Sequence, residues 1–216
     1  MIQHVYERAM SCPEISKVFV ATDDKRISAC VIEFGGKVVM TEQTHRSGTD
    51  RICEAATKIG LNTEDLVINI QGDQPIFHPS IVSRLVKPFV EDRSVPMTTV
   101  KWKITNPDDI RNPNHVKVVT DRQGFALYFS RYPLPFFRDG ESRQAHYKHL
   151  GFYGFRMEFL LKFTRLSQGV LEAAEKLEQL RALEHGFKIK VVETPFNSIE
   201  VDVPEDVMRV EEILVG

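Results

Sequence analysis

Short apolar runs alternate with segments of helical periodicity along the first 90 residues of this chain. The runs predict buried strands, and the segments between them predict helices. When strands and helices alternate, each helix crosses a face of a mostly parallel sheet, so both faces become covered. We therefore predict an α/β fold. The expected elements are helices at 1–10, 25–34, 49–59 and 80–90 and strands at 17–21, 37–41 and 66–70.

The alternation stops near residue 98, where antiparallel pairing becomes the better prediction. Strand-like runs at 115–120 and 125–130 are joined across DRQG at 121–124, which is typical of a hairpin turn. Because 216 residues can bury one complete core, we expect a single domain over 1–216 with a hairpin insertion near 112–156. The other expected elements are strands at 98–104, 149–156 and 188–194, one long helix at 169–185 and a terminal helix at 204–214.

Composition argues against several classes of partner. A net charge of −2 and a pI near 6.4 argue against a surface that binds nucleic acid through clustered Lys and Arg. No run reaches the ~18 apolar residues that a spanning helix needs, and the opening residues lack the apolar part of a signal peptide. Cys12, Cys30 and Cys53 lack zinc-site spacing, so we expect small buried hydrophobes in a reducing compartment. We expect a cytoplasmic protein with no membrane partner.

Two acidic segments follow predicted strands. The strand at 66–70 leads into NIQGDQP at 69–75, and a short strand is expected to end at Asp202 within EVDVPED at 200–206. Ligands bind at the carboxyl ends of strands in open α/β sheets, and a carboxylate beside a glycine there can hold a divalent metal against phosphate oxygens. Asp73 and Asp202 could share one metal. The alternative for GDQP is ordinary turn chemistry, with Asp73 capping the next helix.

The heptad HRSGTDR at 45–51 follows a strand and precedes a helix. Its hydroxyls, the Gly48 backbone and the helix N-terminus could hydrogen-bond a base or ribose. The alternative is a helix cap with Arg46 and Arg51 in solvent. Neither G-x-G-x-x-G nor G-x-x-x-x-G-K-[ST] occurs, so dinucleotide dehydrogenases and P-loop NTPases are poor candidates.

Together these three segments resemble the cytidylyltransferases that activate acidic sugars, most closely the 3-deoxy-manno-octulosonate (KDO) cytidylyltransferase family. The similarity continues through NPNHVKVV at 112–119, ALYFSR at 126–131, HLGFYGFR at 149–156 and LEQLR at 177–181, in the family's order. Family members begin with a strand and a triphosphate-binding loop, and this sequence resembles the family from just after that loop. We expect a truncated reading frame, with strand edges that lack their partner.

The resemblance implies a Rossmann-like nucleotidyltransferase sheet and a Mg²⁺-dependent reaction. CMP would pass from CTP to the anomeric hydroxyl of KDO, giving CMP-KDO and pyrophosphate for lipopolysaccharide biosynthesis. It implies that Asp73 and Asp202 are the catalytic metal ligands. The implied nucleotide-binding residues are Arg46, Ser47, Gly48, Thr49 and Gln71, and the implied sugar-binding residues are Arg131, His149, Tyr153, Glu178 and Gln179.

Structural alternatives exist for the sugar-binding candidates. Arg131 could form a surface ion pair, Tyr153 could be a core ring, and Glu178 with Gln179 could lie on a solvated helix face. For His149 we expect a positioning role rather than general-base catalysis. The aromatic residues around the irregular segment after residue 131 predict a homodimer interface, as in the family: Phe136, Phe137, Phe152 and Phe155.

Two other functions remain open. A cytidylyltransferase for a different acid sugar, of the N-acylneuraminate type, would share the fold and the metal site. A catalytically inactive, truncated remnant could bind a sugar acid without turnover.

Overall fold

The computed structural model describes residues 1–45, 47–138, 145–201 and 204–215, the last range with the backbone alone at 204, 205, 209, 214 and 215. The helices are α1 Ile2–Met10, α2 Lys25–Glu33, α3 Gly48–Lys58, α4 Ser80–Glu91, α5 Pro107–Arg111, α6 Met157–Phe163, α7 Val170–Glu175, α8 Leu180–Glu184 and α9 Pro204–Val215. The strands are β1 Val20–Thr22, β2 Val38–Met40, β3 Leu66–Asn69, β4 Met97–Lys103, β5 Lys117–Thr120, β6 Ala126–Ser130, β7 Tyr147–Arg156 and β8 Ile189–Thr194.

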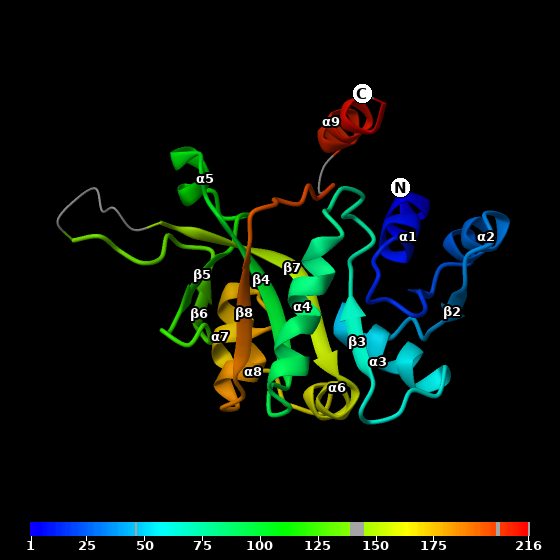
Figure 1. The fold of residues 1–216 in the computed structure, drawn as a ribbon, viewed down its shortest axis with the longest axis horizontal. Helices are drawn as coiled ribbons and strands as arrows, with labels where there is room; N and C mark the ends of the chain where they lie inside the picture. The colour runs from blue at the N-terminus through cyan, green and yellow to red at the C-terminus, as the bar shows by residue number, and fades with distance from the viewer. Residues whose placement is uncertain (46, 139–144, 202–203, 216) are drawn as a thin grey trace.

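The larger sheet is organised around the long strand β7 (Figure 1). One edge of β7 pairs antiparallel with β4, and the other pairs with β5 near the start of β7 and with β3 near its end. Because β8 is parallel to β4, and β5 is antiparallel to both β6 and β7, the strands β3, β4, β5 and β8 run one way. The α/β prediction is confirmed. The sheet is mixed, since β7 lies antiparallel between β3 and β4.

Helices cover both faces of this sheet, as predicted. On one face, α1 and α4 pack on β4 and β7, with Leu85, Val100, Leu150 and Phe152 fully buried. On the other face, α3, α6 and α8 pack on the hairpin, β7 and β8. Side chains of β7 thus reach two cores, because successive residues of a strand point to opposite faces. No helix in the described ranges is long and apolar enough to cross a membrane.

The hairpin prediction is confirmed, whereas the single helix predicted at 169–185 is wrong. The segment forms two short helices, and Lys176 ends α7 in the left-handed conformation with φ 55°. Arg181 donates to both carboxylate oxygens of buried Glu172, at 2.6 and 2.8 Å. Residues nine apart in one helix are separated by about 13 Å along the axis. The chain must therefore fold back for this buried pair to form.

Four further expectations need correction. The strand expected before Asp202 is reduced, in its described part, to an isolated bridge between Ile199 and Ile76. The helices α5 and α6 were not predicted. Cys30, which lies in α2, is exposed, whereas Cys12 and Cys53 are buried as expected. Phe152 and Phe155 belong to the two cores rather than to an exposed cluster.

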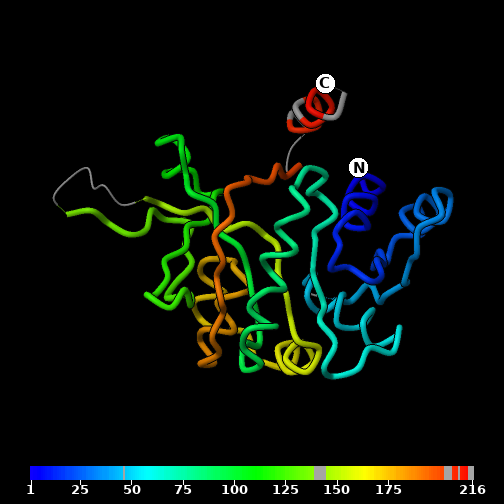
Figure 2. The backbone as a smooth tube through the Cα atoms, in the orientation of Figure 1, coloured from blue at the N-terminus to red at the C-terminus, as the bar shows by residue number. Residues whose placement is uncertain are grey.

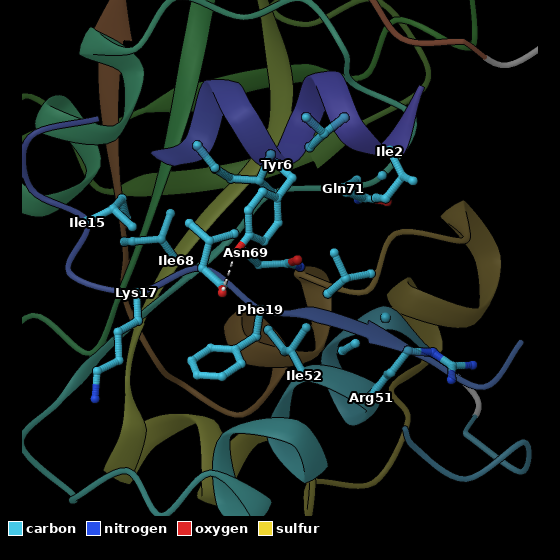
Figure 3. Close-up of a pocket in the computed structure, with 18 residues that line it drawn as sticks. Ile2, Tyr6, Ile15, Lys17, Phe19, Arg51, Ile52, Ile68, Asn69 and Gln71 are labelled. Carbon is cyan, nitrogen blue, oxygen red and sulfur yellow. Dashed lines mark hydrogen bonds between the residues drawn. The ribbon is translucent and has the colours of Figure 1, made fainter. Parts of the chain in front are cut away.

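The strands β1 and β2 form a separate parallel pair. Within the described ranges, β1 pairs only with β2 and β3 pairs only with β7. Between β1 and β3 lies a largely apolar slot of about 1040 Å³, open to solvent and lined by α1, residues 15 and 17–21, residues 68–72 and the start of α3 (Figure 3). The hydroxyl of Tyr6 donates to the Val18 carbonyl at 3.5 Å within this apolar slot.

The buried pair between Arg181 and Glu172 makes a stability prediction. Arg181→Met should lower the free energy of unfolding by about 3 kcal/mol, because it leaves the Glu172 carboxylate buried and uncompensated. The double variant with Glu172→Met should recover most of this loss, and Arg111→Met at the exposed end of α5 should change little. Urea unfolding measures all three. A loss below about 1 kcal/mol for Arg181→Met would contradict this role of the pair.

Candidate active site

A polar cleft opens where the sheet is interrupted beside β7. Along the edge of β7 that faces away from β4, Lys148 pairs with Lys117 of β5, and pairing with β3 begins only at Tyr153. On the opposite edge, β7 carries a bulge at residues 151–152. The β7 cleft has an empty volume of about 940 Å³. It is lined by Gly48, Thr49, Asn69, Gln71, Asp73, Gln74, Asn114, Val116, Lys148, His149, Gly151, Tyr153, Lys176, Leu177, Glu178, Gln179 and Glu200.

The turn after β3 forms one wall of this cleft. Gly151 lets the turn approach β7, because a Cβ at that position would lie 3.2 Å from Gln74 Nε2 and 3.4 Å from Gln71 Nε2. Buried Gln74 donates from Nε2 to Glu200 Oε1 at 3.2 Å. The half-buried Asp73 carboxylate lines the same wall.

The segment after β8 closes against this turn. Figure 2 shows the chain passing from β8 toward the loop that follows β3. The Val201 amide donates to the Asp73 carbonyl at 2.9 Å, so residues 199–201 lie against the Asp73 turn. Asp202 and Arg46, two of the predicted site residues, lie outside the described residues.

The N-terminus of α3 forms the opposite wall. Ser47 caps the helix by accepting from the Asp50 amide at 3.2 Å, and buried Thr49 donates to Glu178 Oε2 at 2.7 Å. Burial raises the pKa of the Glu178 carboxyl, and hydrogen bonds from Ser47 and Thr49 partly oppose that rise. Arg51 donates to the Thr41 hydroxyl and the Asp23 carboxylate, at 2.6 and 3.0 Å, so the alternative in which Arg51 lies free in solvent does not hold.

His149 is buried and neutral at the floor of the cleft. Burial, followed by the charge of Lys148, lowers the pKa of its imidazole to about 3. Its Nε2 lies 2.8 Å from the Thr99 hydroxyl, which also lies 2.8 Å from the Phe152 carbonyl. The Thr99 hydroxyl has one proton, which it donates to the Phe152 carbonyl, so it accepts the hydrogen bond from His149. We therefore assign the imidazole proton to Nε2. Nδ1 is then an acceptor, which suits a positioning role.

Tyr153 and Gln179 meet beside His149. The phenol donates to Gln179 Oε1 at 3.1 Å, and burial raises the pKa of Tyr153, so its hydroxyl stays protonated. Gln179 is 3% exposed, and its Nε2 has no hydrogen-bond partner among the described residues. The structure thus brings four of the five predicted sugar-binding residues to one cleft: His149, Tyr153, Glu178 and Gln179.

Arg131 is the exception, because it does not line the β7 cleft. Its guanidinium donates to the carbonyls of Glu175 and Pro113, at 2.8 and 3.0 Å. These residues adjoin Lys176 and Asn114, which do line the cleft. Arg131 therefore holds the backbone behind two parts of the wall.

Sequence reasoning did not single out Gln74, Asn114, Lys148 or Glu200 as site residues. Gln74, Asn114 and Glu200 lie inside motifs that marked the site, and Lys148 directly precedes His149. The sequence signal that could have identified these four residues is their position within or next to those motifs. No group of three His, Cys, Asp or Glu side chains in the described part of the chain is arranged to hold a metal ion.

The chain is similar to known proteins over most of its length. The sequence profile of the family described as "Cytidylyltransferase" matches residues 1–189. The chain belongs to this cytidylyltransferase family.

The relatives define the similarity more closely. The chain is 51% identical to the 3-deoxy-manno-octulosonate cytidylyltransferase of Syntrophus aciditrophicus, over 100% of this chain and 87% of that protein. It is 50% identical to the protein of the same name from Desulfatibacillum aliphaticivorans, over 99% of this chain and 87% of that one. A solved structure of CMP:2-keto-3-deoxy-manno-octonic acid synthetase complexed with CTP matches with a TM-score of 0.92 and 38% identity, over 99% of this chain and 87% of that chain.

A more distant structure shares the fold alone. It is that of a putative glucose-1-phosphate thymidylyltransferase from Bacillus anthracis, with a TM-score of 0.62 at 14% identity, covering 98% of this chain and 81% of that one. The α/β architecture thus extends beyond the close relatives.

The buried His149 makes a prediction about pH. Because its folded-state pKa is depressed, its contribution to stability is present above pH 6.5 and is lost as the pH falls toward about 3. Over pH 6 to 4 the free energy of unfolding should fall faster than in His149→Asn, by about 1.4 kcal/mol per pH unit at most. Urea unfolding at several pH values tests this, with His4→Asn, an exposed histidine, as control. Equal slopes for the chain and His149→Asn would contradict a buried neutral imidazole.

Proposed function

We propose that this chain transfers CMP from CTP to the anomeric hydroxyl of KDO and releases pyrophosphate. The observation that carries the proposal is the β7 cleft, which gathers the polar residues of six separate motifs in a chain 51% identical to a KDO cytidylyltransferase over its full length. In this reaction, the sugar oxygen forms a bond to the α-phosphorus and the bond between the α- and β-phosphates breaks. The hydroxyl proton leaves to solvent, and pyrophosphate is the leaving group.

The two walls of the cleft suit the two substrates. Gly48 and Thr49 line the cleft at the N-terminus of α3, where backbone N–H groups and the Thr49 hydroxyl suit a base or ribose, and Gln71 lies opposite. Ser47, which caps this helix, does not line the cleft itself. We assign the cytidine portion to this side, with Arg46 as an additional candidate. The hydroxyl-rich sugar acid is assigned to His149, Tyr153, Glu178 and Gln179, which offer both donors and acceptors.

We propose that a magnesium ion binds at the Asp73 turn. Asp73 and Glu200 supply carboxylate oxygens to the same cleft, and oxygen ligands are those that Mg²⁺ prefers. We propose Asp73 and Asp202 as its ligands, since Val201, the neighbour of Asp202, hydrogen-bonds the Asp73 backbone. When bound, the ion would neutralise phosphate charge.

We further propose a homodimer that acts in the cytoplasm. Support for an interface comes from apolar side chains along β6 and the segment after it, where Leu127, Tyr132 and Phe136 are 62%, 75% and 83% exposed. Such exposed patches often mark interfaces. Sedimentation should give a dimer for the chain and a shift toward monomer for Phe136→Ser. A monomeric chain would contradict this arrangement.

Pyrophosphate release from CTP and KDO with Mg²⁺ tests the reaction. Release should require both substrates and should be much slower with N-acetylneuraminate. Asp73→Asn should cut turnover by about 100-fold or more while keeping the circular dichroism spectrum, because it removes a charged metal ligand. Asp108→Asn, on the exposed side of α5, is the matched control.

Each alternative function has its own outcome in this assay. Faster release with N-acetylneuraminate would favour a different acid sugar. No release with either sugar would favour a catalytically inactive sugar-binding protein and would contradict the proposal.

A further inference from the structure

Lys148 lies where the β7 cleft meets a second polar cavity. It is on β7, beside Trp102 of β4 and Lys117 of β5, and its side chain is 8% exposed. The second cavity lies between α5 with its following loop and residues 197–200. Three residues line both cavities: Asn114, Lys148 and Glu200.

The ammonium of Lys148 lacks a short bond to a carboxylate in the described residues. The nearest such oxygen, Glu200 Oε1, lies 3.8 Å from Lys148 Nζ, whereas charge-assisted hydrogen bonds are about 2.7–2.9 Å long. The same oxygen accepts from Gln74 Nε2 at 3.2 Å. Burying an ammonium is costly unless an anion pairs with it at close range. The site is therefore suited to a second anion.

Other cations near the cleft are less suited to this task. Arg131 donates to two backbone carbonyls and does not line the cleft. Arg181 forms its two-bond pair with Glu172. Lys176 lines the cleft but is exposed to solvent, where an ion pair contributes little. Among the described residues that line the cleft, Lys148 is the buried cation.

We propose that Lys148 binds the carboxylate of the sugar acid and thereby selects acid sugars over neutral ones. This inference rests on the proposed function for the substrate class. The amides of Gln74 and Asn114 line the cleft with Lys148 and offer further donors to an anion. The carboxylate of the sugar acid would form with Lys148 the short ion pair that Glu200, at 3.8 Å, does not form.

A binding cycle tests this role. Titration calorimetry would compare KDO with its uncharged carboxamide, on the chain and on Lys148→Met. The chain should bind KDO about 30-fold or more tightly than the amide, and Lys148→Met should lose that preference while its affinity for the amide changes less than about threefold. Lys148→Arg should keep part of the preference, because it retains the charge.

Controls separate binding from folding. Lys101→Met removes a half-buried lysine of β4 that does not line the cleft, and it should keep the full preference. If Lys148→Met is unfolded by circular dichroism, the cycle is completed with Lys148→Gln. Equal affinity of the chain for acid and amide would overturn the proposal, and so would equal losses for both ligands in the variant.

The failure of this inference can be told apart from failure of the proposed function. If the chain releases pyrophosphate from CTP and KDO but Lys148→Met keeps the preference for the acid, only the role of Lys148 is wrong. If the cycle behaves as expected but no pyrophosphate is released, the carboxylate site stands and the catalytic proposal falls. If KDO does not bind at all, both proposals are wrong.

Discussion

The unequal pairing of β7 is the constraint on which the rest of this structure depends. Along one edge β7 is held by β4, whereas its other edge is shared between β5 and β3 with an interruption between them. Beside this interruption, β7 has a bulge at residues 151–152, and Gly151 has no side chain. The amides of Gln71 and Gln74 can therefore reach the strand. Bulges of this kind are frequent next to active sites because they redirect side chains. The polar cleft is therefore a consequence of how the sheet is assembled.

The walls of the cleft are held in place by interactions that lie outside it. The buried pair between Arg181 and Glu172 folds α8 back on α7, so the turn that carries Glu178 and Gln179 faces the sheet. Arg131 ties the backbone at Glu175 and Pro113 behind the same region. A site supported in this way keeps its geometry before a ligand arrives, which lowers the cost of binding.

Local pattern predicted much of this fold, and non-local contacts explain where it failed. The strand–helix alternation, the hairpin and the gathering of the motifs at 47–49, 71–73, 149–153 and 178–179 followed from apolar periodicity and motif resemblance. The prediction of a single helix at 169–185 was wrong because the chain turns at Lys176, which lets Arg181 pair with Glu172 nine residues earlier. The carbonyl partners of Arg131 and the burial of Lys148 depend on strand pairing, which no local pattern reports.

The central claim is that the sugar acid binds in the cleft beside β7 and the nucleotide at the N-terminus of α3. A crystal structure of the chain with CMP and KDO tests this most directly. We expect sugar density along residues 148–153, with the carboxylate at Lys148 Nζ and the cytidine beside Thr49 and Gln71. Sugar density away from β7, for example in the apolar slot between β1 and β3, would contradict it.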